Sequence, residues 1–366
     1  MGFRDYYRQF DDIDEAKLNI ERRERRRREK AAALQVVPDI DLSGTEWPDL
    51  PHSEIVNAAI ARARGRINGY PDRHATAARR LLAERLGLQP DQIALGNGAA
   101  ELLQSAAVAL LSEGDELAMP WPSYPLYPLM AAHAGATPVS VEDGDVAAAV
   151  TEATRAVVIC NPNDPTGSYI DSDGLRSLLS SLPESVHVLL DEALVHFQDA
   201  EDVDACLRLV DDFPRLLVVR TFSKIYGLSG LRAGYAVGSD PELLAAVAPV
   251  LGVNALTQAA LEHALRTGDA EIERRRRAVS RGRSRLIDGL RELGADVADS
   301  QANFVWVQAP GMSGDALAVA LRRQGVVVAP GGPLGADDHV RVGVLNATAT
   351  DRVLRAYENA VGATGE

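Results

Sequence analysis

A single lysine stands where an apolar run meets a segment of hydroxyl and glycine residues. Residues 216–219 predict a buried strand, and Lys224 follows in the sequence TFSKIYGLSGLRAG at 221–234. Ligands of open α/β sheets bind at the carboxyl ends of the strands, so this position favours a ligand site. A lysine withdrawn from water can lose its proton and attack a carbonyl carbon, which is Schiff-base chemistry. The side chains around it that can hold a phosphate are Thr221, Ser223 and Arg232.

A second segment predicts an anion site built from backbone groups. Residues 93–95 predict a strand, and the sequence GNGAAE at 96–101 follows it and opens an apolar helix. The first N–H groups of a helix have no partner within the helix and attract anions. A plain strand-to-helix turn is the alternative, although such a turn needs one glycine rather than two. The amides that would meet the anion belong to Gly98, Ala99 and Ala100.

The lysine segment resembles that of the class I and II aminotransferases, which use pyridoxal 5'-phosphate (PLP), and is most like that of the histidinol-phosphate aminotransferases. Six further segments occur in the order that this family requires, and the resemblance runs from about residue 40 to residue 361. They are YPD at 70–72, GNGAAE at 96–101, PWPSYP at 120–125, NPNDPTG at 161–167, LDEAL at 190–194, and NF at 303–304 with HVRVG at 339–343. The resemblance implies that Lys224 holds PLP as a Schiff base and, once released, moves the substrate proton.

The same resemblance implies roles for side chains outside the lysine segment. Asp191 would keep the pyridine nitrogen protonated, a charge that makes the ring an electron sink. The ring of Tyr124 would lie against the pyridine face. Arg341 would clamp the substrate carboxylate through its guanidinium, together with Asn303. Tyr70 would reach the cofactor phosphate of a neighbouring subunit, which implies a homodimer with shared active sites.

Three positions depart from the family's pattern. The residue before PTG is usually an asparagine that donates to the phenolic oxygen of the cofactor, whereas Asp164 is a carboxylate that can only accept. We still expect Asp164 beside the cofactor, and Asn163 could supply the missing donor. A tyrosine that touches the same oxygen is replaced by Leu194. An arginine that helps histidinol-phosphate enzymes bind the substrate phosphate is replaced by Ala329, which favours an amino acid with one carboxylate.

The implied function is transamination between an amino acid, or a histidinol-phosphate-like amine, and a 2-oxo acid. A PLP decarboxylase or lyase of the same fold, similar to the threonine-phosphate decarboxylases, is the alternative, because the sequence does not fix which Cα bond stands perpendicular to the ring. A PLP-binding protein without catalysis is a third hypothesis, which the presence of Lys224, Asp191 and Arg232 opposes. The amino donor is open, since Trp47 and Trp121 could line an aromatic pocket or serve packing alone.

Helical segments and short β-branched runs alternate after residue 51, which predicts βαβ units and a mostly parallel sheet. Strands are predicted at 93–95, 116–119, 156–160, 187–190, 216–219 and 233–237, a long arginine-rich helix at 270–293, and further strands within 295–307 and 325–344 with a helix between them. The resemblance implies the fold-type I α/β fold, with a large domain on a mixed, mostly parallel seven-stranded sheet and a small α+β domain. The domains would be an N-terminal helical arm at 1–40, a large PLP-binding domain at 41–270, with 41–65 contributing to the small domain, and the small C-terminal domain at 271–366.

Composition limits the class of protein and its partners. With 366 residues, of which 46% are hydrophobic and 25% charged, the chain is typical of a globular protein of about two domains. A net charge of −14 opposes nucleic-acid binding, which requires clustered lysine and arginine. The arginines at 22–28 are interleaved with glutamates in a predicted solvent-exposed helix over 10–34. Two cysteines and the lack of a secretory signal or an apolar stretch of about 20 residues favour a cytoplasmic protein without a metal site or a membrane span.

Overall fold

The computed structural model describes residues 22–25, 38–65, 67–142 and 145–362. Contacts divide the chain into two units, Met1–Ile40 and Asp41–Glu366. In the first unit residues 22–25 are helical, and the rest of the helix expected over 10–34 lies outside the described residues. Strand β1 (Ile40–Asp41) lies at the boundary between the units. Every feature described below belongs to the second unit.

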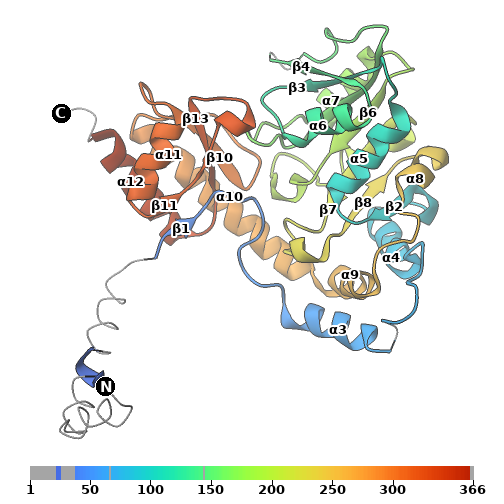
Figure 1. The fold of residues 1–366 in the computed structure, drawn as a ribbon, viewed down its shortest axis with the longest axis horizontal. Coiled ribbons are helices and arrows are strands. Elements are labelled where there is room, and N and C mark those ends of the chain that lie inside the picture. The colour runs from blue at the N-terminus through green and yellow to red at the C-terminus, as the bar shows by residue number, and fades with distance from the viewer. Residues whose placement is uncertain (1–21, 26–37, 66, 143–144, 363–366) are drawn as a thin grey trace, which may run out of the picture. The chain divides into compact units, whose positions relative to one another are not determined.

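A seven-stranded sheet forms the centre of the second unit (Figure 1). Its strands, in order across the sheet, are β2 (Ile93–Gly96), β8 (Gly234–Val237), β7 (Leu216–Thr221), β6 (His187–Asp191), β5 (Thr154–Cys160), β3 (Glu116–Pro120) and β4 (Thr137–Val141). Strand β8 runs antiparallel to both of its neighbours, and the remaining pairs are parallel. The mixed, mostly parallel sheet of the prediction is confirmed, and its six predicted strands begin and end within two residues of the observed bounds.

Helices cover this sheet, and its central strands β6 and β7 are buried apart from the half-buried His187 at the start of β6, as parallel strands with helices on both faces require. The helices of this part of the chain are α3 (Ser53–Ala63), α4 (Thr76–Leu86), α5 (Ala99–Leu110), α6 (Leu126–His133), α7 (Ser172–Ser181), α8 (Pro241–Val247) and α9 (Ala255–Thr267), of which α3 packs on α9 rather than on the sheet. Helix α5 lies across the sheet and contacts β5, β6, β7 and β8. Its buried face consists of alanine and leucine, at Ala99, Leu102, Leu103, Ala106 and Ala107, so the helix can approach the strands closely.

The C-terminal third of the chain forms a second, smaller sheet. A long helix, α10 (Asp269–Glu292), leads to it from α9 (Figure 1). The sheet is antiparallel, in the order β12 (Ala329–Pro330), β13 (His339–Gly343), β10 (Phe304–Gln308) and β9 (Asp296–Val297), and is accompanied by α11 (Gly314–Arg323) and α12 (Ala347–Gly362). The short strand β11 (Val326–Val327) follows α11.

The N-terminal segment after β1 packs onto this smaller sheet. The N–H of Leu42 donates to the carbonyl of Val327 at 2.8 Å, and the N–H of Gly343 donates to the carbonyl of Leu42 at 2.8 Å. Residues 43–47 are thereby held beside β13, next to the edge of the large sheet where Asp191 and Lys224 lie. Residues 42–47 and strand β13, from opposite ends of the sequence, therefore lie side by side.

Short 3-10 helices fill several connections, at η1 (Pro90–Gln92), η2 (Val195–Phe197), η3 (Leu207–Asp211), η4 (Ser229–Leu231) and η5 (Gly332–Leu334). Among the helices of the described ranges, none combines the length and apolar character needed to span a membrane. Within those same ranges, no three His, Cys, Asp or Glu side chains are grouped so that they could hold a metal ion.

Candidate active site

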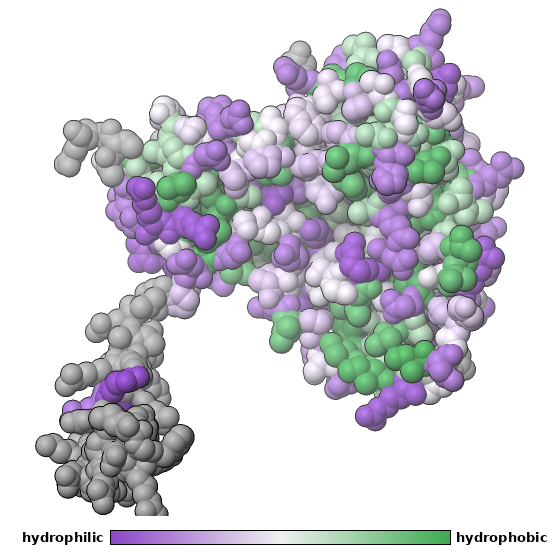
Figure 2. All heavy atoms as spheres, in the orientation of Figure 1, coloured by the Kyte–Doolittle hydropathy of each residue, from purple (hydrophilic) through white to green (hydrophobic). Residues whose placement is uncertain are grey.

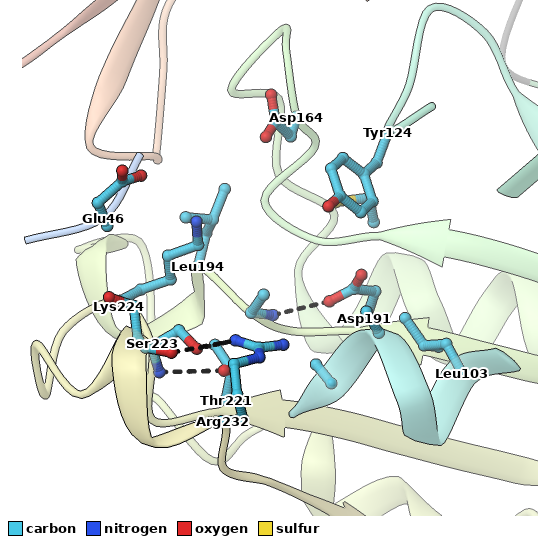
Figure 3. Close-up of a pocket in the computed structure, with 15 residues that line it drawn as sticks. Glu46, Leu103, Tyr124, Asp164, Asp191, Leu194, Thr221, Ser223, Lys224 and Arg232 are labelled. Carbon is cyan, nitrogen blue, oxygen red and sulfur yellow. Dashed lines mark hydrogen bonds between the residues drawn. The ribbon is translucent and has the colours of Figure 1, made fainter. Parts of the chain in front are cut away.

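A cavity of about 290 Å³ opens at the carboxyl ends of β5, β6 and β7. Nine of the predicted catalytic and cofactor-binding residues line it, namely Ala99, Ala100, Tyr124, Asp164, Asp191, Thr221, Ser223, Lys224 and Arg232, and so does Leu194. Figure 3 shows the side chain of Lys224 extending toward Glu46 and Asp164, with Asp191 and Tyr124 on the opposite side. The strand ends therefore bring together side chains that are up to 133 residues apart in the sequence, from Ala99 to Arg232.

Lys224 is a largely buried amine. Its Nζ donates to the hydroxyl of Thr45 at 2.5 Å. Burial lowers the pKa of Lys224, and the carboxylates of Asp164 and Glu46 oppose that shift. A lysine whose neutral form is favoured in this way is a better nucleophile toward a carbonyl carbon than a solvated one.

The start of α5 and Arg232 form a cradle for an anion. Gly98, the residue before α5, has φ 101° and offers no side chain to cap the helix, and Ala99 and Ala100 of the first turn line the cavity although Gly98 itself does not. A Cβ on Gly98 would lie 2.4 Å from Nη2 of Arg232, and the guanidinium of Arg232 lies 3.3 Å from Oγ of Ser223. In β8, a Cβ on Gly234 would lie 2.6 Å from the amide nitrogen of Ala99, so glycine allows the strand to approach the helix. Helix amides, a guanidinium and hydroxyl groups are the donors that a phosphate dianion requires.

Asp191 is a buried carboxylate held by two hydrogen bonds. The hydroxyl of Tyr127 donates to Oδ2 at 3.0 Å, and the N–H of Ala193 donates to Oδ1 at 3.0 Å. Burial raises the pKa of Asp191 to about 6, although both hydrogen bonds act in the opposite direction. A buried carboxylate of this kind is best satisfied by a cation, and a protonated ring nitrogen would serve. The cavity thus fits an aromatic cofactor that carries an aldehyde, a phosphate and a basic nitrogen.

Arg341 is paired with Asp164, which lines the same cavity as the lysine. The guanidinium of Arg341 forms an ion pair with the carboxylate of Asp164, and its Nη2 donates to the carbonyl of Ser43 at 2.8 Å. The centre of the Phe304 ring lies 5.2 Å from the guanidinium carbon. The predicted substrate clamp is therefore already paired with the residue that was predicted to face the cofactor.

Two asparagines serve structural contacts. Asn163 was considered as a replacement donor, but its amide donates to the carbonyl of Pro122 at 3.0 Å and to the hydroxyl of Thr166 at 2.8 Å, so its donors are engaged elsewhere. Asn303 does not line the cavity. Its amide donates to the carbonyl of Thr45 at 2.9 Å and so holds the segment that contacts Lys224. Its predicted contact with substrate stays a prediction.

Three aromatic residues of the sequence analysis lie away from the cavity lining. Tyr70 is 87% exposed, as a residue that reaches a neighbouring subunit would be. Trp47 packs against the guanidinium of Arg275, whose carbon lies 4.7 Å from the ring centre. Trp121 packs against Gly335, where a Cβ would lie 2.6 Å from its ring nitrogen. Neither tryptophan is among the described residues that line the cavity around the lysine.

The sequence analysis missed several residues of the site. Thr45 and Glu46 lie beside Lys224, yet about 180 positions separate them from it in the sequence, and no local pattern marks them. Tyr127 is the hydrogen-bond donor to Asp191, and its only local signal is its place one helical turn after Tyr124. Tertiary structure alone brings these groups to the cavity.

Comparison with known proteins agrees with this geometry. The family model for aminotransferase class I and II matches residues 37–357. An aromatic amino acid aminotransferase of Corynebacterium jeikeium is 40% identical over 326 residues, which cover 85% of this chain and 86% of that protein. Histidinol-phosphate aminotransferase 1 of Nitrosococcus oceani is 37% identical over 329 residues, covering 87% and 88%.

A solved structure extends the agreement to the fold. The histidinol-phosphate aminotransferase of Sinorhizobium meliloti, in complex with pyridoxal-5'-phosphate, is 25% identical and has a TM-score of 0.78, with 89% of this chain and 92% of that chain covered. The fold-type I architecture and the resemblance drawn from the sequence are both confirmed. The chain therefore belongs to the class I and II aminotransferases, a family of PLP-dependent transaminases.

Proposed function

We propose that this aminotransferase moves the amino group of an aromatic amino acid to a 2-oxo acid, with PLP bound covalently to Lys224. One observation carries the proposal. A largely buried amine, a buried carboxylate and a phosphate cradle line a single cavity at the carboxyl edge of the sheet. Each of them matches one functional group of PLP, namely its aldehyde, its ring nitrogen and its phosphate.

The chain's own residues have separable tasks in this mechanism. Bound PLP supplies an electron sink that stabilises negative charge at the substrate Cα. Lys224 would hold the cofactor through Nζ, and its amine, once free, would be the base that moves a proton from the substrate Cα. The carboxylate of Asp191 would hold a proton on the ring nitrogen, and the ring of Tyr124 would cover the cofactor and exclude water. The residues that would hold the phosphate are Thr221, Ser223, Arg232 and the amides of Gly98, Ala99 and Ala100.

The aromatic substrate is supported by the C-terminal sheet as well as by the relatives. Ala329 in β12 lies directly opposite Arg341 in β13. Residues directly opposite each other on antiparallel strands point to the same face, so an arginine at 329 would stand beside Arg341 and make a double clamp suited to a phosphate. With alanine there, Arg341 is left as a single guanidinium, which matches a single carboxylate. Leu103 and Leu194 add apolar lining to the cavity.

A panel of amino donors tests this proposal. Phenylalanine, tyrosine, histidinol phosphate and aspartate would each be given to the holoenzyme with a common 2-oxo acid. We expect kcat/KM to be about 10-fold or more higher for the aromatic donors than for histidinol phosphate, because a second phosphate ligand is worth at least ~1.4 kcal/mol. Preference for histidinol phosphate would contradict the substrate assignment, and release of carbon dioxide in place of a 2-oxo acid would contradict the reaction.

We also propose a homodimer with shared active sites. Exposed apolar side chains gather on α3 and the segments next to it, and Figure 2 shows a hydrophobic patch in the region that α3 and α9 occupy in Figure 1. They are Val56, Ile60, Ile67, Tyr70, Val250 and Leu251. Gly252 lies against the backbone of Arg73, where a Cβ would be 2.6 Å from the carbonyl oxygen, so the segment around 250 adjoins the segment around Tyr70. A contiguous apolar patch of this kind is typical of a subunit interface.

A cytoplasmic location completes the proposal. Cys160 and Cys206 are both buried free thiols. Free thiols persist in a reducing compartment, where disulfides are rare. The substrates proposed here are small metabolites of such a compartment.

A further inference from the structure

The carboxylate clamp of this site is occupied by a carboxylate of the protein itself. Arg341 and Asp164 form an ion pair, and their side chains are 11% and 9% exposed. Arg341 comes from β13 of the smaller sheet, and Asp164 comes from the loop after β5 of the large sheet. Breaking a buried pair leaves charges without compensation, so neither partner is free to bind a ligand without a cost.

The remaining contacts of Arg341 hold its guanidinium in this position. Nη2 donates to the carbonyl of Ser43 at 2.8 Å, and the ring of Phe304 lies 5.2 Å from the guanidinium carbon. The Nε group is buried and has no hydrogen-bond partner among the described residues. A carboxylate is bound most strongly by two parallel N–H groups, and the pair with Asp164 already uses Nη1.

We infer that Asp164 competes with substrate for the carboxylate clamp: it occupies Arg341 in the absence of substrate and has to be displaced by an incoming carboxylate. The inference rests on the proposed function, in which Arg341 is the carboxylate clamp. Asp164 then weakens the binding of every carboxylate ligand, while contacts to the uncharged remainder of the ligand are unaffected. This cost is common to all amino acids, so it leaves the ratio of their affinities unchanged and lowers the affinity of a carboxylate ligand relative to an uncharged analogue.

Calorimetry on the holoenzyme tests the inference without catalysis. The probe is 3-phenylpropionate, which has a carboxylate and an aromatic ring but no amine, in a buffer free of carboxylates. We expect Asp164→Asn to lower the Kd of this probe on the order of 10-fold, because the competing charge is removed and a side chain of the same shape remains. The Kd of 3-phenyl-1-propanol, which lacks the carboxylate, should stay unchanged.

Two control backgrounds separate the ion pair from general electrostatics. Glu46 lines the same cavity, but its carboxylate accepts from the N–H of Thr45 at 3.1 Å. Glu46→Gln removes one negative charge from the cavity and should leave the Kd of 3-phenylpropionate within about 2-fold of its original value. In an Arg341→Gln background, Asp164→Asn should give no gain. If Asp164→Asn folds poorly, Asp164→Ser makes the same test.

The outcomes are distinguishable from failure of the proposed function. An unchanged or higher Kd for 3-phenylpropionate in Asp164→Asn, an equal gain for the alcohol, or an equal gain from Glu46→Gln would each overturn the inference. Acetate, measured alongside, addresses the aromatic preference separately. If 3-phenylpropionate binds no more tightly than acetate in every variant, the aromatic preference fails, while the ratio between Asp164→Asn and the parent enzyme still decides the role of the ion pair.

Discussion

Asp191 is a site residue whose buried carboxylate lowers the stability of the cofactor-free protein. Its carboxylate is buried at the end of β6, and burial raises its pKa to about 6 from an ordinary value of 3.8. A group whose folded-state pKa is raised contributes stability that is complete below its unfolded pKa and is lost as the pH rises through its folded pKa. In the protein without cofactor, the free energy of unfolding should therefore fall between about pH 4 and pH 6, as the buried carboxyl group loses its proton.

Asp191→Asn should stabilise the cofactor-free protein at neutral pH while it abolishes tight cofactor binding. The pKa difference of about 2 units corresponds to roughly 3 kcal/mol at pH 7, and this gain should vanish below about pH 4. Urea unfolding of both cofactor-free proteins across pH 4–8 measures it. Parallel pH profiles for variant and parent would show that the buried carboxylate carries no such cost.

Residues with local sequence signals were predictable, and residues brought in by tertiary contacts were not. Lys224, Asp191 and Arg232 each lie in a recognisable segment at or near the end of a strand, and all three line the cavity. Thr45 reaches Lys224 because Leu42 is held on the smaller sheet, a contact with no trace in the local sequence. The pairing of Asp164 with Arg341 joins positions 177 residues apart and was equally hidden.

At the scale of elements, the cradle depends on how closely β8 and the start of α5 approach each other. Glycine at 98 and at 234 makes this approach possible, since a side chain at either position would overlap Arg232 or the backbone of Ala99.

The central strands were predictable because a buried parallel strand is a continuous apolar run. Strand β4 was missed because it is largely exposed and contains Pro138, a residue confined to edge strands and bulges.

Strand β7 ends at Thr221, two residues beyond the predicted end of this strand at residue 219. The strand continues through Arg220, a polar residue that is nevertheless fully buried. Its guanidinium donates to Glu192 at 2.7 Å and to the carbonyl of Val203 at 2.7 Å. A buried charge of this kind requires partners from other elements, and a single segment of sequence does not reveal them.

Gly98→Ala should damage the cradle while the fold is retained. The backbone at Gly98 has φ 101°, and the new Cβ would displace Arg232. We expect the affinity for PLP to fall about 10-fold or more, measured by absorbance titration, because both strain and a lost charged contact act on the phosphate. Gly87→Ala is the matched control, since Gly87 has φ 69° but nothing within 4 Å of its Cβ position. Equal losses in both variants would mean that backbone strain alone is responsible.

At the scale of the whole molecule, the site draws on both sheets and on the N-terminal segment. Asp191 and Lys224 come from the large sheet, Arg341 from the smaller one, and Thr45 from the chain after β1. The sequence predicted that these parts of the chain would contribute to one site, because the family's segments occur in the expected order. The division of the chain into domains near residue 270, with 41–65 contributing to the small domain, stays a prediction.

Complementation between two defective variants tests whether the sites are shared between subunits. Lys224→Ala removes the amine, and Tyr70→Ala removes the side chain proposed to reach the partner's cofactor. Each variant should have little activity alone. In a hybrid dimer one site would carry both changes and the other neither, so a refolded mixture should regain activity. If native mass spectrometry shows hybrid dimers but activity does not return, Tyr70 acts within its own subunit or not at all.

Covalent capture of PLP by Lys224 is the claim on which the remaining ones depend. The holoenzyme would be reduced with borohydride and digested, and the modified peptide identified by mass spectrometry, with Lys224→Ala as the matched control. We predict a single reduced phosphopyridoxyl adduct on Lys224 in the parent enzyme and none at that peptide in the variant. An adduct on another lysine, or a parent enzyme that takes up no reducible cofactor, would contradict the account.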